Sequence, residues 1–149
     1  MEILNMTAAH EAAVLEMMRQ FYASPAVLSN GSEAIFRRDI AACVSDSPFI
    51  EGYVFAEGQT LMGYAMVAAT FNCEYGLPCR WIEDLYILPR FRSQGIGTEV
   101  IRRCIESSRG AGIFLYVFRE NKRAVSLYER LGFTVRETAG TTRLIMHRD

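Results

Sequence analysis

The 149-residue sequence contains no long apolar run, no long basic run and no cluster of metal ligands. No stretch approaches the roughly 20 consecutive apolar residues that span a membrane. The first residues, Met1 to Asn5, lack the basic-then-apolar order of a signal peptide. We therefore expect a cytoplasmic protein that does not bind membranes.

Charges of the two signs are nearly balanced, with 16 Lys and Arg against 17 Asp and Glu. Neither the formal net charge of −1 nor any local basic run predicts a nucleic-acid partner. Half of the residues are hydrophobic and 22% are charged, which is typical of a folded globular protein rather than a disordered chain. At this length we expect one domain over residues 1–149.

Cysteine and histidine are too scattered for a structural zinc site. The cysteines are Cys43, Cys73, Cys79 and Cys104, none of them in a C-x-x-C pair, and the two histidines lie at opposite ends of the chain. We predict free thiols and no bound metal. Cys73 and Cys79 flank a predicted turn, and the sequence leaves open whether they pair.

Hydrophobic periodicity predicts strands alternating with helices. The predicted strands are 2–6, 49–56, 61–71, 79–88, 113–118, 133–137 and 142–147, and the predicted helices follow Thr7, Ser32, Gly97 and Asn121. The strand–helix–strand order from 79 to 118 is a βαβ unit, so its two strands should be parallel neighbours. The apolar run 113–118 predicts a strand buried on both faces. The expected fold is α/β, with one mixed sheet and helices on both faces.

Residues 92–98, Arg92-Ser93-Gln94-Gly95-Ile96-Gly97-Thr98, join a predicted strand to a predicted helix. Two glycines let the backbone turn tightly and bring successive N–H groups close to a ligand. A helix that begins at Gly97 or Thr98 adds its unpaired first-turn N–H groups and the positive end of its dipole. This pattern predicts a cradle for an anion such as phosphate or pyrophosphate.

The glycine pair does not continue into either of two common nucleotide-binding motifs. A dinucleotide-binding fold would have a third glycine where this chain has Val100. A Walker loop would have Gly-Lys-Ser/Thr after the turn, and Ile96-Gly97-Thr98 contains no lysine. Both alternatives are therefore disfavoured.

Two further segments are candidates for chemistry. Glu83-Asp84 interrupts an apolar strand, and because adjacent strand residues point to opposite faces, only one of the two can face a given cleft. A solvated or Arg-paired acid at a strand end is the alternative. Asn121, Ala124 and Tyr128 fall on one helical face, where core packing is the alternative to a functional role.

In this order, the motifs resemble the Gcn5-related N-acetyltransferase (GNAT) superfamily. The matching residues are Asp84-Leu85-Tyr86-Ile87-x-Pro89-x-x-Arg92-x-x-Gly95-Ile96-Gly97 and Asn121-x-x-Ala124-x-x-x-Tyr128-x-x-x-Gly132-Phe133. Within the family, Glu83-Asp84-Leu85-Tyr86-Ile87 is most similar to the diamine and polyamine acetyltransferases. The resemblance implies a mostly antiparallel sheet whose central parallel strands splay apart.

The resemblance also implies acetyl-CoA as co-substrate, without a metal. Its pyrophosphate is expected on main-chain N–H groups of residues 94–98, with Arg92 at the rim, and its pantetheine arm along residues 85–87. Asn121 and Ala124 are expected to line the far wall, with Tyr128 at the sulfur. The implied cofactor-binding residues are Leu85, Tyr86, Ile87, Arg92, Ser93, Gln94, Gly95, Ile96, Gly97, Thr98, Asn121, Ala124 and Tyr128.

Acyl transfer to an amine indicates which residues could be catalytic. An alkylamine is mostly protonated at neutral pH, so a base is required, and Glu83 is our candidate. Tyr128 is the candidate acid for the departing thiolate. The acids Glu33, Asp39, Glu51 and Glu74 lie in or near segments that bind the acceptor in this family. They favour a cationic acceptor, with a small-molecule amine or polyamine preferred.

Three matters stay open at this point. The acceptor could instead be a lysine or N-terminus of a protein or peptide. The chain could also bind acetyl-CoA as a sensor without turnover. Homodimers are frequent in the family, and no stretch of this sequence decides the oligomeric state.

Overall fold

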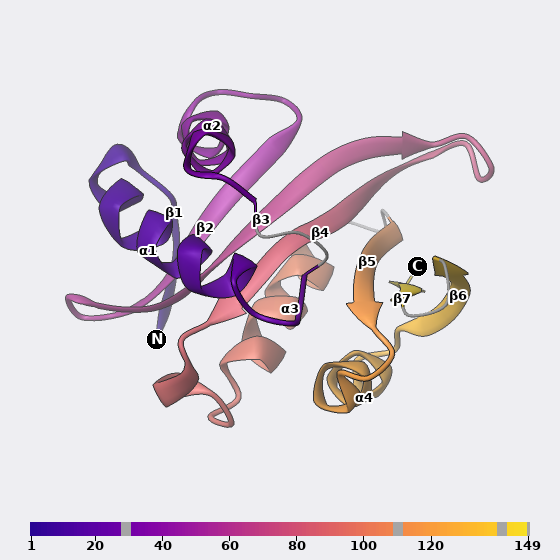
Figure 1. The fold of residues 1–149 in the computed structure, drawn as a ribbon. Helices are drawn as coiled ribbons and strands as arrows, with labels where there is room; N and C mark the ends of the chain where they lie inside the picture. The colour runs from indigo at the N-terminus through magenta and orange to yellow at the C-terminus, as the bar shows by residue number, and fades with distance from the viewer. Residues whose placement is uncertain (28–30, 109–111, 140–142, 149) are drawn as a thin grey trace.

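A computed structural model describes residues 1–27, 31–108, 112–139 and 143–148 (Figure 1). The described elements, in chain order, are β1 (Glu2–Asn5), a 3-10 turn η1 (Ala8–His10), α1 (Glu11–Tyr22), α2 (Glu33–Val44), β2 (Ile50–Glu57), β3 (Thr60–Asn72), β4 (Leu77–Ile87), η2 (Pro89–Phe91), α3 (Ile96–Ser107), β5 (Gly112–Phe118), α4 (Lys122–Arg130), β6 (Thr134–Ala139) and β7 (Arg143–Arg148). No helix in these segments is long and apolar enough to cross a membrane. The glycine at position 140, in the last predicted turn, lies outside the described residues.

The described strands form one seven-stranded sheet in the order β1-β2-β3-β4-β5-β7-β6. The β4–β5 pair is parallel, and each of the other pairs is antiparallel. This confirms the predicted α/β fold with a central parallel pair. The chain continues from β5 through α4 to β6 at the sheet edge, and β7 then returns between them.

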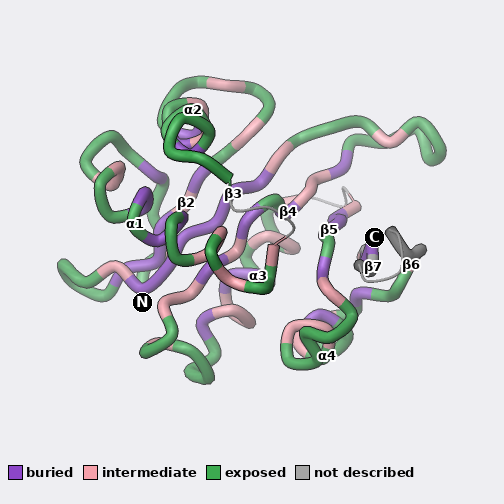
Figure 2. Tube along the Cα trace, viewed as in Figure 1, coloured by how far each residue is buried: buried purple, intermediate pink, exposed green. Residues whose placement is uncertain are grey.

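Helices cover both faces of the sheet, as predicted. Apolar side chains of α1 and α2 form one core with residues of β2, β3 and β4, and Figure 1 shows both helices over that part of the sheet. On the other face, α3 packs against Phe55, Met62 and Ala65, and α4 shares a core with β5 through Tyr128. Figure 2 shows that buried positions concentrate in the central strands and on the inner sides of the helices.

One prediction about β5 was wrong. Its buried positions are Ile113, Phe114, Leu115 and Val117, whereas Tyr116 is 45% exposed. Tyr116 contacts the Trp81 ring at a centroid distance of 4.9 Å. Because α1 and α2 pack on β2, β3 and β4, their cover does not extend over this part of β5.

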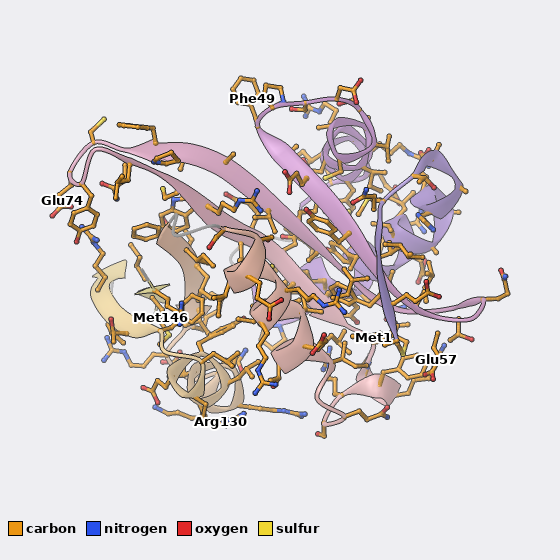
Figure 3. The ribbon with its side chains drawn as sticks, turned by 180° about the vertical axis from the view of Figure 1, so that it is seen from behind. Met1, Phe49, Glu57, Glu74, Arg130 and Met146 are labelled. Atoms are coloured by element: carbon orange, nitrogen blue, oxygen red, sulfur yellow. The ribbon has the colours of Figure 1, made fainter. Side chains whose placement is uncertain are left out.

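The hairpin between β3 and β4 is longer than the sequence indicated. Its turn contains only residues 73–76, because Asn72 Oδ1 accepts hydrogen bonds from the N–H groups of Glu74 (2.9 Å) and Tyr75 (3.2 Å). Arg136 of β6 pairs with Glu74 and donates to the Tyr75 hydroxyl at 2.7 Å, which ties the hairpin end, labelled at Glu74 in Figure 3, to the far edge of the sheet. All four cysteines are free, with Cys73 exposed in this turn and Cys79 buried on β4.

Candidate functional site

Strand β4 separates from β5 halfway along its length. Cys79 to Ile82 pair with Gly112 to Leu115, and the pairing ends there. Both strands continue, β4 to Ile87 and β5 to Phe118, so the predicted splay is present. Residues 83–87 of β4 therefore have β3 on one side and no β5 partner on the other, which leaves a backbone edge open to an extended ligand.

A β-bulge lies where the splay begins. Met66 of β3 pairs with Asp84, whereas the next residue, Val67, pairs with Ile82, so Glu83 is an extra residue in β4. The extra residue changes which side chains share a face. Ile82 packs with the core under α4, and Asp84 lies on the opposite face, against Tyr22 of α1.

The loop that follows β4 has the backbone shape of an anion cradle. Ser93 and Gly95 both adopt left-handed conformations, with φ of 63° and 82°. Helix α3 begins at Ile96, slightly earlier than predicted, and its first intrahelical bond runs from Glu99 N to Gly95 O at 3.0 Å. The N–H groups of residues 96–98 precede that bond and are available to an anion.

Gly97 allows this helix end to approach two other elements. A Cβ atom placed there would lie 3.3 Å from Leu127 Cδ2 of α4 and 3.5 Å from Ile87 Cδ1 of β4. The Leu127 side chain would have to shift slightly to make room, whereas the distance to Ile87 is an ordinary van der Waals contact. The glycine therefore keeps the first turn of α3 close to both walls of the splay.

A cleft of about 950 Å³ connects these features. The predicted residues that line it are Leu85, Tyr86, Ile87, Arg92, Ser93, Gly95, Ile96, Gly97, Thr98, Asn121, Ala124 and Tyr128. Two predicted residues, Gln94 and Glu83, do not line it. Gln94 is exposed and donates to the Arg90 carbonyl at 3.4 Å, and Glu83 is exposed on the bulge.

Tyr128 presents a phenol to the cleft from α4. Its ring is buried against Phe133, at a centroid distance of 5.7 Å, and within the described residues its hydroxyl makes no hydrogen bond. Burial raises the pKa of Tyr128 to about 12. The phenol is therefore protonated at neutral pH and able to donate.

Asn121 holds the start of α4. Its Oδ1 accepts a hydrogen bond from Ala124 N at 3.3 Å, which makes Asn121 the N-cap of the helix. Both residues also line the cleft. The motif spacing therefore places a helix cap and a small wall residue in the same cleft as Tyr128.

The two adjacent carboxylates of β4 have different environments. Asp84 is only 4% exposed and accepts hydrogen bonds from the hydroxyls of Tyr64 (2.7 Å) and Tyr22 (2.8 Å), and burial raises its pKa to about 6. Glu83 is exposed, and its partial desolvation, together with the nearby Asp39 charge, raises its pKa above the usual value. Glu83 is thus the carboxylate that solvent or a substrate can reach.

Comparison with known proteins agrees with this geometry. The family model described as "Acetyltransferase (GNAT) family" matches residues 14–133, which is more than half of the chain. The chain belongs to the GNAT acetyltransferase family.

Three similar proteins illustrate the range of this family. Mouse thialysine N-epsilon-acetyltransferase is 35% identical over 80 residues, covering 52% of this chain and 46% of the relative. Mycobacterium tuberculosis N-alpha-acetyltransferase RimI is 29% identical over 103 residues, covering 67% and 59%. The chain thus spans about half the length of these relatives. A crystal structure of Vibrio cholerae spermidine N-acetyltransferase, in complex with CoA and spermine, shares the fold at a TM-score of 0.76 and 17% identity, covering 99% of this chain and 94% of that one.

The structure adds cleft residues to this GNAT domain that the motifs did not indicate. They are Phe21, Ser24, Pro25, Ala26, Phe91, Phe118, Glu120, Arg123, Leu127 and Arg130. The end of α1 forms the wall facing β4, where Phe21 stacks on Tyr86 at 5.2 Å. Arg123 donates to Ser93 Oγ across the cradle, and Arg92 donates to the Ile87 carbonyl at 2.8 Å. The only sequence signal for Arg123 is its place in the first turn of α4.

We expect replacement of Arg123 by glutamine to weaken acetyl-CoA binding by roughly tenfold, because charge-assisted hydrogen bonds contribute about 1.5–3 kcal/mol. Isothermal titration at two salt concentrations measures the effect, which should shrink at high salt. Arg102→Gln is the matched control, since Arg102 is exposed on α3 and does not line the cleft. Equal affinities for the two variants would exclude Arg123 from the cradle.

Proposed function

We propose that this protein is an acetyl-CoA-dependent N-acetyltransferase that transfers the acetyl group directly to a primary amine, with a small-molecule amine or polyamine as the favoured acceptor. One observation carries the proposal. A single cleft contains the anion cradle, the open backbone edge of β4 and the Tyr128 hydroxyl. These are the groups needed at the pyrophosphate, the pantetheine arm and the sulfur of acetyl-CoA.

Acetyl-CoA supplies the thioester, and this chain supplies its binding groups. The N–H groups of residues 96–98 and the guanidinium of Arg123 suit the pyrophosphate. The free edge of residues 85–87 suits the amides of the pantetheine arm. A backbone N–H of Leu85 or Tyr86 is placed to stabilise the carbonyl oxygen as it becomes negative.

The proposed reaction is direct. The neutral amine nitrogen attacks the thioester carbon, and Glu83, directly or through water, accepts the proton that the amine loses. The carbon–sulfur bond then breaks, and Tyr128 donates a proton to the departing thiolate. The products are an N-acetylated amine and the free thiol, so none of the cysteines has a catalytic role.

The charge around the bulge supports a cationic acceptor. Asp39, Glu83 and Asp84 interact electrostatically, and no salt bridge neutralises any of them within the described residues. The names of the mouse and Vibrio relatives refer to thialysine and spermidine, which are cationic amines. The RimI relative is instead named as an N-alpha-acetyltransferase, which keeps a peptide acceptor as the second candidate.

Thiol release from acetyl-CoA with a panel of acceptors tests the proposal. The panel contains spermidine, a short diamine, thialysine, a lysine-containing peptide and a peptide with a free N-terminus. We expect release to be fastest with a small-molecule amine, and mass spectrometry should find one added acetyl group on it. Release with peptides alone would favour the second candidate. Acetyl-CoA binding without release would indicate a sensor. A cytoplasmic location stays a prediction, and whether the protein forms a homodimer stays open.

A further inference from the structure

Asp84 is a buried carboxylate that takes no part in the steps described above. Its hydrogen-bond donors are two phenols, from Tyr22 at the end of α1 and Tyr64 in the middle of β3. The residues are far apart in the sequence and meet only in the fold. A carboxylate buried without a cation is costly, so its retention in the core calls for a structural or functional reason.

The position of Asp84 directly follows the bulge. With Glu83 as the extra residue, Ile82 faces the α3–α4 side, and Asp84 and Tyr86 face the α1–α2 side. Moving the bulge by one residue would exchange the faces of Glu83 and Asp84, because side chains alternate along a strand. The hydrogen bonds to Asp84 oppose that exchange.

The same residues join α1 to the splayed half of β4. Next to Tyr22, Phe21 stacks on the Tyr86 ring, and Gln20 Oε1 accepts a hydrogen bond from the Tyr86 hydroxyl at 3.1 Å. Consecutive residues of the last turn of α1 thus contact Asp84 and Tyr86. These contacts fix the position of the α1 wall of the cleft relative to the open edge of β4.

We propose that Asp84, held by Tyr22 and Tyr64, is a positioning residue that fixes the bulge at Glu83 and so sets the point where β4 leaves β5. Its consequence for catalysis rests on the proposed function. The bulge leaves Glu83 exposed beside the cleft and sets which backbone N–H, that of Leu85 or Tyr86, points to the open edge of β4. The two tyrosines and Asp84 therefore determine whether base and oxyanion donors face the reacting atoms together.

The groups that face Asp84 explain how pH acts on this arrangement. Among the described residues they are Tyr22 from α1, Asp39 and Cys43 from α2, Tyr64 from β3 and Glu83 beside it on β4. None of these groups is a cation, and Arg38 offsets part of the charge of Asp39. Ionised Asp84 accepts hydrogen bonds from both phenols. Once protonated, it must donate its own proton, so one of the two bonds changes its direction or is lost.

The test compares Tyr64→Phe, Tyr22→Phe and the double variant with a matched control, Tyr53→Phe. Tyr53 also donates to a carboxylate, that of Glu51, but lies outside the cleft and the network. The first measurement is amide hydrogen exchange, which does not depend on activity. We expect exchange of residues 83–86 to rise by about tenfold in the double variant, since hydrogen bonds to a charged group are lost. Residues 79–82, paired with β5, should be unaffected.

The second measurement is kinetic. With an acceptor found in the panel, we expect kcat to fall by about tenfold while the KM for acetyl-CoA stays within about twofold, because small displacements of reacting groups slow chemistry more than binding. Asp84→Asn should act in the same direction and should remove the part of the acidic limb that comes from protonation of Asp84, whose pKa is about 6.

The outcomes separate the two proposals. If wild-type protein acetylates no amine, the proposed function fails, and altered exchange still supports the positioning role. If the variants only melt earlier, with wild-type exchange at residues 83–86 and wild-type kcat, Asp84 is a packing residue and the inference is overturned. A control variant that behaves like the double variant would overturn it as well.

Discussion

Replacing Tyr128 by phenylalanine should lower kcat for acetyl transfer by about 100-fold, the lower range for loss of a general acid. Tyr128 is buried and lines the cleft, its phenol is protonated at neutral pH, and its ring packs on Phe133. The substitution removes the oxygen and keeps the ring, so the affinity for acetyl-CoA and the melting temperature should change little. Stopped-flow thiol release measures kcat, titration calorimetry the affinity, and thermal unfolding the melting temperature.

Tyr116→Phe is the control for this change. Tyr116 is on β5, is 45% exposed and does not line the cleft. Removing its hydroxyl should leave kcat within about twofold of wild type, because most substitutions at the surface have small effects. Unchanged turnover in the Tyr128 variant would remove that residue from the mechanism.

Replacing Glu83 by glutamine should lower kcat/KM for the acceptor by roughly 100-fold near neutral pH, because the amine loses its proton acceptor. The base is active when ionised, and its ionised fraction falls as pH drops through a pKa that lies above the usual glutamate value. Wild-type activity should therefore decline on the acidic side at a higher pH than a free glutamate would give. The variant should lack the part of this limb that Glu83 causes and keep any part that comes from protonation of Asp84, whose pKa is about 6. The measurement is a pH–rate profile for both proteins.

Glu57→Gln provides the control for Glu83. Glu57 is exposed at the end of β2 and does not line the cleft. We expect its pH profile to match wild type. If the Glu83 variant keeps both wild-type kcat/KM near neutral pH and the wild-type acidic limb, another group or solvent acts as the base.

Local sequence signals predicted most of the fold because they reflect interactions between residues that are close together in the chain. The cap at Asn121 and the left-handed residue at Gly95 each satisfy a backbone requirement within a few residues. The βαβ order predicted the parallel pair, because crossovers of that kind have one favoured geometry. The splay was predicted only through the family resemblance, and the structure shows it at Glu83.

The candidate site was only partly predictable, because local sequence signals do not report which distant residues meet in the fold. Residues 85–87 and 92–98 are continuous motifs, Asn121, Ala124 and Tyr128 form a spaced one, and most of these residues line one cleft. Phe21 and Arg123 reach that cleft through their positions in the fold and carry no motif of their own. Pairing across the molecule, as between Arg123 and Ser93, depends on how α4 packs against the loop after β4.

By itself, the sequence determined the family, the order of the elements and the presence of an anion cradle before a helix, because these depend on residue spacing along the chain. The tertiary structure alone decided the different environments of Glu83 and Asp84. Their adjacency in the sequence says only that they face apart, whereas the bulge makes Glu83 the extra residue and two distant tyrosines bury Asp84. Burial and long-range hydrogen bonds arise from packing. Here they leave Glu83 accessible and make Asp84 the carboxylate that we propose holds β4 in place.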